Sequence, residues 1–118
     1  MSKLLLTALM LLAFSTASPV YPANGKGNTE KIRVGSKSFT ESVILGEMLI
    51  QLAEQTGNEA RHQRQLGGTR VLWNALLASE IDAYPEYTGT LMQETLVSEG
   101  LKNEAQLEQA LAKRGLRM

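Results

Sequence analysis

Two short segments of the chain concentrate side chains that can hydrogen-bond a small solute. The first runs from Ser36 to Glu41 (SKSFTE) and the second from Pro85 to Thr90 (PEYTGT). Both are rich in hydroxyl groups, and they add the ammonium of Lys37 and the phenol ring of Tyr87. An ammonium and hydroxyls can hold an anionic group, whereas the face of an aromatic ring attracts a cation through its quadrupole. These residue types suit the binding of a small solute.

The residues that an enzyme would need are scarce. His62 is the only histidine, and it stands among polar neighbours on a stretch that we expect to be exposed. The chain has no cysteine, so it offers no thiol nucleophile, and it shows no metal-ligand spacing. The Gly-Gly-Thr turn at residues 67–69 lacks the lysine of a phosphate-binding loop. We therefore expect no catalytic activity, no metal site and no cofactor.

The first elements that would position these segments are a strand and a helix. Residues 32–35 (IRVG) form a short β-branched run and predict a strand. Thr40 can cap a helix that carries Glu41 in its first turn and ends at Gly57. The apolar face of this helix is wide enough to pack onto a sheet. It consists of a stripe of Ile44, Met48 and Leu52, with Leu45, Leu49 and Ala53 beside it.

A second strand and a second helix follow. Residues 59–66 are almost entirely polar, but we place a strand there because an α/β alternation requires one between two helices. Residues 67–68 form a glycine turn. Thr69 then caps a helix that extends through residue 78.

The remaining elements are one strand and two helices. Residues 81–84 (IDAY) predict a third strand, and Pro85 ends its ladder because proline has no N–H to donate. A third helix opens at residues 88–90. Asn103 and Gln106 form a capping-box-like start for a fourth helix.

This order of elements predicts an α/β fold with a mostly parallel sheet flanked by helices. In such sheets, ligands bind at the carboxyl ends of the strands. The two hydroxyl-rich segments follow the first and third predicted strands, so the site should lie between them.

The N-terminus has the pattern of a secretory signal peptide. Lys3 precedes an apolar run at residues 4–14, and small residues in an A-x-A-like spacing follow. We predict cleavage after Ala17, so that residues 1–17 are the signal peptide, with Ala23 as a later alternative. The apolar run is shorter than the about 20 residues that a bilayer requires, and a retained membrane anchor is the alternative interpretation.

The remaining chain has the size of one small domain with balanced charge. Residues 24–31 are polar and contain glycine, and they predict a flexible leader before residues 32–118. The 12 basic and 12 acidic residues form no long block of one sign, so nothing indicates nucleic acid, which would call for a basic face. Because the chain has no cysteine to carry a lipid, we expect it to be exported to the periplasm. We expect it to be a monomer.

Two blocks of sequence resemble a known family. GSKSFTESVILGEML (residues 35–49) and LGGTRVLWNALLASEIDAYPEYTGT (residues 66–90) look like the osmoprotectant-binding proteins of ABC importers. This is the glycine betaine, carnitine and choline group, which has a type II periplasmic-binding fold. The resemblance runs from about Ile32 to the end, and GSKxFTE together with YPEYTGT is a specific signature. It implies a soluble, two-lobed receptor that delivers a quaternary-ammonium solute to a membrane permease, with residues 32–118 supplying most of one lobe.

The resemblance also implies which residues bind the solute. Lys37 would help to hold the ligand carboxylate, Tyr87 would form one wall of an aromatic cage, and Thr90 would add a further carboxylate contact. Ser36 and Thr40, in the same segment as Lys37, are weaker candidates. The assignment requires that Lys37 and Tyr87 face the same crevice. The alternatives are a solvated Lys37 and a Tyr87 that only packs in the core.

Three neighbouring residues are expected to be structural. We expect Trp73, which lies within the second predicted helix, to pack in the core of the protein, and Tyr84 to point into the lobe. Glu86 is expected to be a hydrogen-bonding partner for its own loop rather than a catalytic acid.

A second hypothesis belongs to a different class. The chain would be a truncated, non-transporting remnant that is inert or binds a protein partner through an exposed apolar surface. A lone lobe leaves its ligand half exposed to water, so we expect this chain to bind betaine very weakly or not at all. An in-frame continuation of the gene beyond Met118 would support the receptor, and a stop codon would support the remnant.

Overall fold

A computed structural model of the protein describes residues 31–118. The predicted signal peptide, its two cleavage sites and nearly all of the predicted leader lie outside the described residues. Within residues 31–118, no helix combines the length and the apolar character that crossing a membrane would require.

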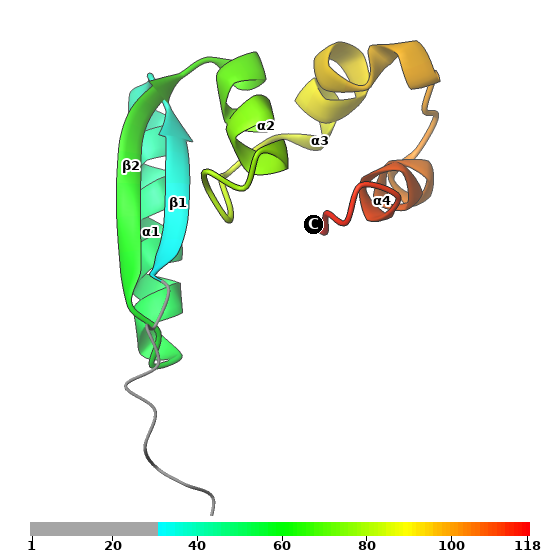
Figure 1. The fold of residues 1–118 in the computed structure, drawn as a ribbon. Helices are drawn as coiled ribbons and strands as arrows, with labels where there is room; N and C mark the ends of the chain where they lie inside the picture. Colours follow the sequence, from blue (N-terminus) through cyan, green and yellow to red (C-terminus); the bar gives the residue numbers. More distant parts are fainter. Residues whose placement is uncertain (1–30) are drawn as a thin grey trace, which may run out of the picture.

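Two parallel strands and the helix between them form the first part of the fold (Figure 1). The strands are β1 (Ile32–Lys37) and β2 (Ala60–Gly67), and the helix is α1 (Thr40–Gln55). The strands pair in parallel with Ile32 opposite Ala60, and the register shifts between Gly35 and Lys37. The α/β class and the parallel pairing are therefore confirmed, including the polar second strand.

The predicted third strand is wrong as a strand. Residues 81–84 run beside β1 in the parallel direction, but they form only an isolated bridge between Val34 and Ala83. The Gly35 amide donates to the Ala83 carbonyl at 2.9 Å. The sheet formed by the described residues therefore has two strands, with a short bridged segment where we expected the third.

The side chain of Asp82 explains why no ladder continues here. Its Oδ2 accepts the Arg33 backbone N–H at 2.7 Å, so a side chain takes a donor that a neighbouring strand would otherwise use. Pro85 follows two residues after the bridge and has no N–H to donate. Backbone pairing therefore stops after one bridge.

The contact between Arg33 and Asp82 predicts a pH-dependent stability. Hydrogen bonds from Arg33 hold the pKa of Asp82 below its ordinary value of 3.8. Because the folded-state pKa is the lower one, the stabilisation is present above about pH 4 and is lost as the pH falls through the lowered pKa. Both side chains are more than a third exposed, so Asp82→Asn should cost only about 0.5–1 kcal/mol near pH 7.

Urea denaturation of wild type and Asp82→Asn at about pH 7 and about pH 3 measures this difference. The gap between the two proteins should narrow at the lower pH, and the exposed control Glu80→Gln should show no gap at either. An equal loss at both pH values would contradict the assignment.

Helix α1 turns a different face inward from the one that we expected. Its predicted stripe is exposed, with 55% of Ile44, 54% of Met48 and 57% of Leu52 accessible to solvent. The residues that α1 buries are Ser42, Gly46 and Ile50. Small side chains on this face let the helix approach β2 closely enough to enclose the ring of a strand residue, His62.

Helix α2 (Thr69–Leu77) ends where we expected, but the capping predictions for α1 and α2 are wrong. Thr40 and Thr69 are the first residues of their helices, Phe39 and Gly68 occupy the cap positions, and no side chain caps either helix. The Thr69 hydroxyl instead accepts a hydrogen bond from the Lys37 ammonium.

The predicted third helix is divided into three short turns. They are α3 (Thr88–Thr90), the π-helical turn η1 (Leu91–Thr95) and the 3₁₀ turn η2 (Val97–Glu99). The fourth helix, α4 (Glu104–Ala112), begins as predicted, because the Asn103 side chain accepts the Gln106 amide at 3.0 Å.

Residues 31–118 contain two apolar clusters. The first lies between the sheet and α2 and consists of Leu72, Ala75 and Ile81. The second joins η1 to α4 and consists of Leu91, Leu96, Leu107, Ala110 and Leu111. In Figure 1 the sheet and α4 lie on opposite sides of α2. The segment that links the two clusters is residues 82–90, which contains the second hydroxyl-rich segment.

Candidate ligand-binding site

The ammonium of Lys37 lies at the end of β1, inside the protein. Its Nζ donates to Glu86 Oε1 at 2.5 Å and to Thr69 Oγ1 at 3.1 Å. The side chains of Lys37 and Glu86 are each only 6% exposed. The alternative of a solvated loop lysine is therefore wrong, because Lys37 is held in a buried ion pair.

Glu86 connects this ammonium to the second hydroxyl-rich segment. The oxygen that accepts from Lys37 also accepts the backbone N–H of Tyr87 at 3.0 Å. The expected role of Glu86 as a hydrogen-bonding partner for its loop is confirmed. Its other oxygen, Oε2, is buried and has no partner among the described residues. Sequence reasoning missed the pairing with Lys37, since 49 positions separate the two residues.

Tyr87 begins the turn that contains Thr90. Tyr87 is 44% exposed to solvent, so the alternative that it packs only in the core is wrong. A hydrogen bond to Glu41 is the main cause that raises the pKa of Tyr87, and the phenol therefore stays neutral near pH 7. Thr90 is half-buried at the end of α3, and Thr40 is exposed at the start of α1.

The candidate residues thus separate into two groups. Lys37 and Tyr87 are joined through one carboxylate oxygen of Glu86, and Thr90 lies one turn beyond Tyr87. Ser36 is fully buried, and its hydroxyl is used by protein groups on the inner side of the sheet.

His62 occupies that inner side, and the expectation that it is exposed is wrong. Its side chain is 5% exposed, with Nδ1 2.7 Å from Glu47 Oε1 and Nε2 2.9 Å from Ser36 Oγ. Hydrogen bonds from His62 and Arg64 lower the pKa of Glu47. The arrangement has the order of a serine–histidine–carboxylate triad, but a substrate cannot reach the buried Ser36 hydroxyl. The contacts instead tie α1 to both strands.

Gly46 gives this histidine its space, and this predicts a stability effect. A methyl group at position 46 would come within 2.5 Å of His62 Nε2 and 2.8 Å of its Cε1. We expect Gly46→Ala to lower the free energy of unfolding by about 1–2 kcal/mol, because overpacking exceeds the gain in helix propensity.

Urea denaturation measures the effect, with Gly89→Ala as the matched control, since a methyl group there would meet nothing within 4 Å. The control should equal wild type or exceed it slightly. A Gly46→Ala protein as stable as the control would show that the ring can move aside.

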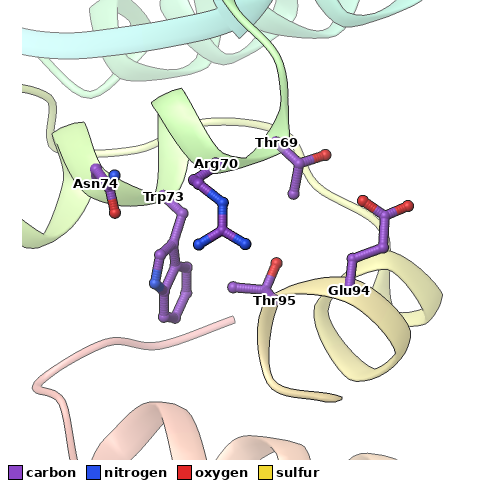
Figure 2. Close-up of a pocket in the computed structure, with 6 residues that line it drawn as sticks. All are labelled: Thr69, Arg70, Trp73, Asn74, Glu94 and Thr95. Atoms are coloured by element: carbon purple, nitrogen blue, oxygen red, sulfur yellow. The ribbon is translucent and has the colours of Figure 1, made fainter. Parts of the chain in front are cut away.

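A cavity of about 180 Å³ is lined in part by Thr69, whose hydroxyl accepts from Lys37 (Figure 2). It lies between the start of α2 and the end of η1. Its lining residues are Thr69, Arg70, Trp73, Asn74, Glu94 and Thr95. Figure 2 shows the Arg70 guanidinium extending beside the indole of Trp73 toward Thr95. Trp73 also packs against the second apolar cluster as a partly buried residue, so it belongs to both the core and the cavity wall.

Tyr84 points into the lobe, as expected, and packs against the first apolar cluster. Its hydroxyl is buried without a hydrogen-bond partner among the residues that the structure describes. Burial, followed by the negative charge of Glu86, raises its pKa well above the ordinary range of a phenol. This residue therefore remains neutral and contributes to packing.

Comparison with known proteins identifies the family. The family described as the substrate binding domain of the ABC-type glycine betaine transport system matches residues 30–117. The glycine betaine-binding protein YehZ of Escherichia coli (strain K12) is 37% identical over 87 residues, which are 74% of this chain and 25% of that protein. The chain belongs to this family of substrate-binding domains of ABC transport systems.

A second relative extends further along the chain. The carnitine transport binding protein OpuCC of Listeria monocytogenes serotype 1/2a (strain 10403S) is 34% identical over 113 residues. These residues are 94% of this chain and 34% of that protein. The chain thus spans about a quarter to a third of the length of these relatives.

Proposed function

We propose that the chain is part of a periplasmic, monomeric solute receptor that captures a quaternary-ammonium osmoprotectant, such as glycine betaine or choline, for an ABC permease. The relatives support this class of solute, since they are named for glycine betaine and carnitine. The observation that carries the proposal is the single Glu86 oxygen that joins the Lys37 ammonium to the Tyr87 backbone.

Tyr87 would bind the cationic end of the solute. A quaternary ammonium has no N–H to donate, so it is recognised by aromatic faces, with about 0.5–2 kcal/mol per contact. The Tyr87 ring suits this role because the residue is 44% exposed.

Lys37, through the one N–H that Glu86 and Thr69 leave unused, and Thr90 would hydrogen-bond the polar end, which is a carboxylate in betaine and a hydroxyl in choline. The half-buried Thr90 lies one turn after Tyr87: Tyr87 is the residue just before the short helix α3, and Thr90 is the last residue of that helix. Thr40 would add a hydroxyl from the exposed start of α1. Ser36 would act indirectly, since its buried hydroxyl fixes the strand position just before Lys37.

Removing the ring at position 87 tests this function. This chain is expected to bind betaine very weakly or not at all, and the exposure of Tyr87 favours very weak binding. In nuclear magnetic resonance titrations of the 118-residue chain, both solutes should therefore shift the amides of residues 87–90, with a millimolar Kd and a binding free energy of about −4 kcal/mol. Tyr87→Ala should weaken binding about tenfold, because the cation loses its aromatic contact. Tyr87→Phe is the matched control and should bind like wild type, since it keeps the ring face.

Two results would contradict the proposal. One is a wild-type chain whose amide signals do not respond to either solute at about 100 mM. The other is a Tyr87→Ala chain that binds as tightly as Tyr87→Phe.

A further inference from the structure

The charge of Lys37 is already balanced inside the protein. Its ammonium lies 2.5 Å from Glu86 Oε1, and both side chains are 6% exposed. An unpaired charge at this depth would be costly, so the two residues act as one neutral unit. A solute that arrives at Tyr87 therefore finds no net positive charge from Lys37, because the carboxylate of the preceding residue, Glu86, balances it.

The hydrogen-bonding capacity of Lys37 is also largely used. An ammonium has three N–H donors, and Glu86 and Thr69 take two of them. The Glu86 oxygen is further fixed by the Tyr87 amide. The ammonium cannot turn fully toward a solute carboxylate without breaking contacts that hold Tyr87, and it has one donor left to offer.

The other charged groups nearby balance one another. Glu41 interacts with Tyr87 and adds a negative charge on that side, whereas Arg117 adds a positive charge in a cavity that Glu86 and Thr88 also line. Arg70 and Glu94 both line the cavity that Thr69 also lines, so a positive and a negative charge oppose each other on that side (Figure 2). These groups and the ion pair carry three positive charges (Lys37, Arg70, Arg117) and three negative charges (Glu41, Glu86, Glu94), so they leave no net charge to attract a carboxylate, while the exposed Tyr87 ring attracts a cation.

We infer that Glu86 is a specificity-determining residue: by pairing with Lys37, it makes this lobe select a quaternary-ammonium solute by its cationic end, whether or not the solute carries a carboxylate. The inference rests on the proposed function and narrows its solute class. Choline, which has no carboxylate, should bind this lobe at least as well as glycine betaine.

A double-mutant cycle on the 118-residue chain tests this inference. Wild type, Lys37→Gln, Glu86→Gln and the variant with both changes are titrated with choline and with glycine betaine, and the ratio of the two Kd values is compared. Glu86→Gln exposes the charge of Lys37 and should shift the ratio about tenfold toward betaine. Lys37→Gln leaves the carboxylate unbalanced and should shift it toward choline. The double variant should stay within about threefold of wild type.

The ratio separates specificity from mere structural support, because a loosened site weakens both solutes alike. A wild type that prefers betaine about tenfold, or a Glu86→Gln ratio equal to that of wild type, overturns the inference, while binding that depends on Tyr87 leaves the proposed function intact. No response of wild type to either solute contradicts both. If a single variant fails to fold, the wild-type ratio decides, since choline binding at least as tight as betaine binding supports the inference and a preference for betaine of about tenfold overturns it.

Discussion

Glu86→Ala is expected to lower the free energy of unfolding by about 3–5 kcal/mol. The change leaves the Lys37 ammonium buried, with Thr69 as the one hydrogen-bond acceptor that it keeps among its contacts in the structure. A buried charge without a counter-charge must either lose its proton or draw water inward, and both cost free energy. Urea denaturation followed by the fluorescence of Trp73, the only tryptophan, measures the loss.

The matched control removes both charges. Replacing buried ion pairs with apolar residues of similar volume is often neutral or stabilising, so Lys37→Met combined with Glu86→Leu should recover most of the stability. Glu94→Ala, at an exposed position, should change it little. A loss below about 1 kcal/mol for Glu86→Ala alone would show that Lys37 has an alternative partner or reaches solvent.

Leu72→Ala should cost about 2–5 kcal/mol, because Leu72 is fully buried at the centre of the first apolar cluster. The space around it is tightly filled, since a methyl group on Gly35 would lie 2.8 Å from Leu72 Cδ1. The truncation therefore leaves a cavity under the strand that ends in Lys37. Val71→Ala is the control, at a neighbouring position that is 49% exposed, and it should cost less than about 1 kcal/mol.

Urea denaturation of both variants measures the two losses in the free energy of unfolding. Equal losses for Leu72→Ala and Val71→Ala would mean that the cluster collapses around the truncated side chain. The Leu72 site would then contribute far less to stability than its burial indicates.

The order of the first elements could be predicted from the sequence because it depends on backbone pairing and alternation. The polar strand β2 forms since its pairing with β1 uses backbone groups, whatever the side chains are. The third strand failed because the Asp82 side chain takes the Arg33 amide. Such side-chain competition for a backbone donor leaves no periodic signal in a sequence.

The inward face of α1 could not be predicted from periodicity alone. Ile44, Met48 and Leu52 form a regular apolar stripe, but the structure turns Gly46 toward the sheet because His62 needs the space of a missing side chain. The inward face is set by the contact of a small residue, Gly46, with a large residue, His62, that lies 16 positions later in the sequence. A single sequence does not reveal such a pairing.

The sequence brought the two hydroxyl-rich segments into one neighbourhood, and the roles of their residues in solute binding stay predictions. One Glu86 oxygen joins the Lys37 ammonium to the Tyr87 backbone, and Glu86 was recognised as a hydrogen-bonding partner for its loop. Its pairing with Lys37 depends on how the bridged segment at residues 82–84 runs beside β1. The third strand that we expected would have placed residues 81–84 beside β1, but it would not have shown which carboxylate pairs with the Lys37 ammonium.

The division of the apolar residues into two clusters has a consequence for how the chain opens. Lys37 ends a strand that rests on the first cluster, whereas Thr90 leads directly into Leu91 of the second. Separate packing units of this kind can unfold separately and exchange their amide hydrogens at different rates. A solute that contacts both Lys37 and Thr90 would link the two clusters. Its binding should therefore bring the amide exchange rates of the two clusters closer together.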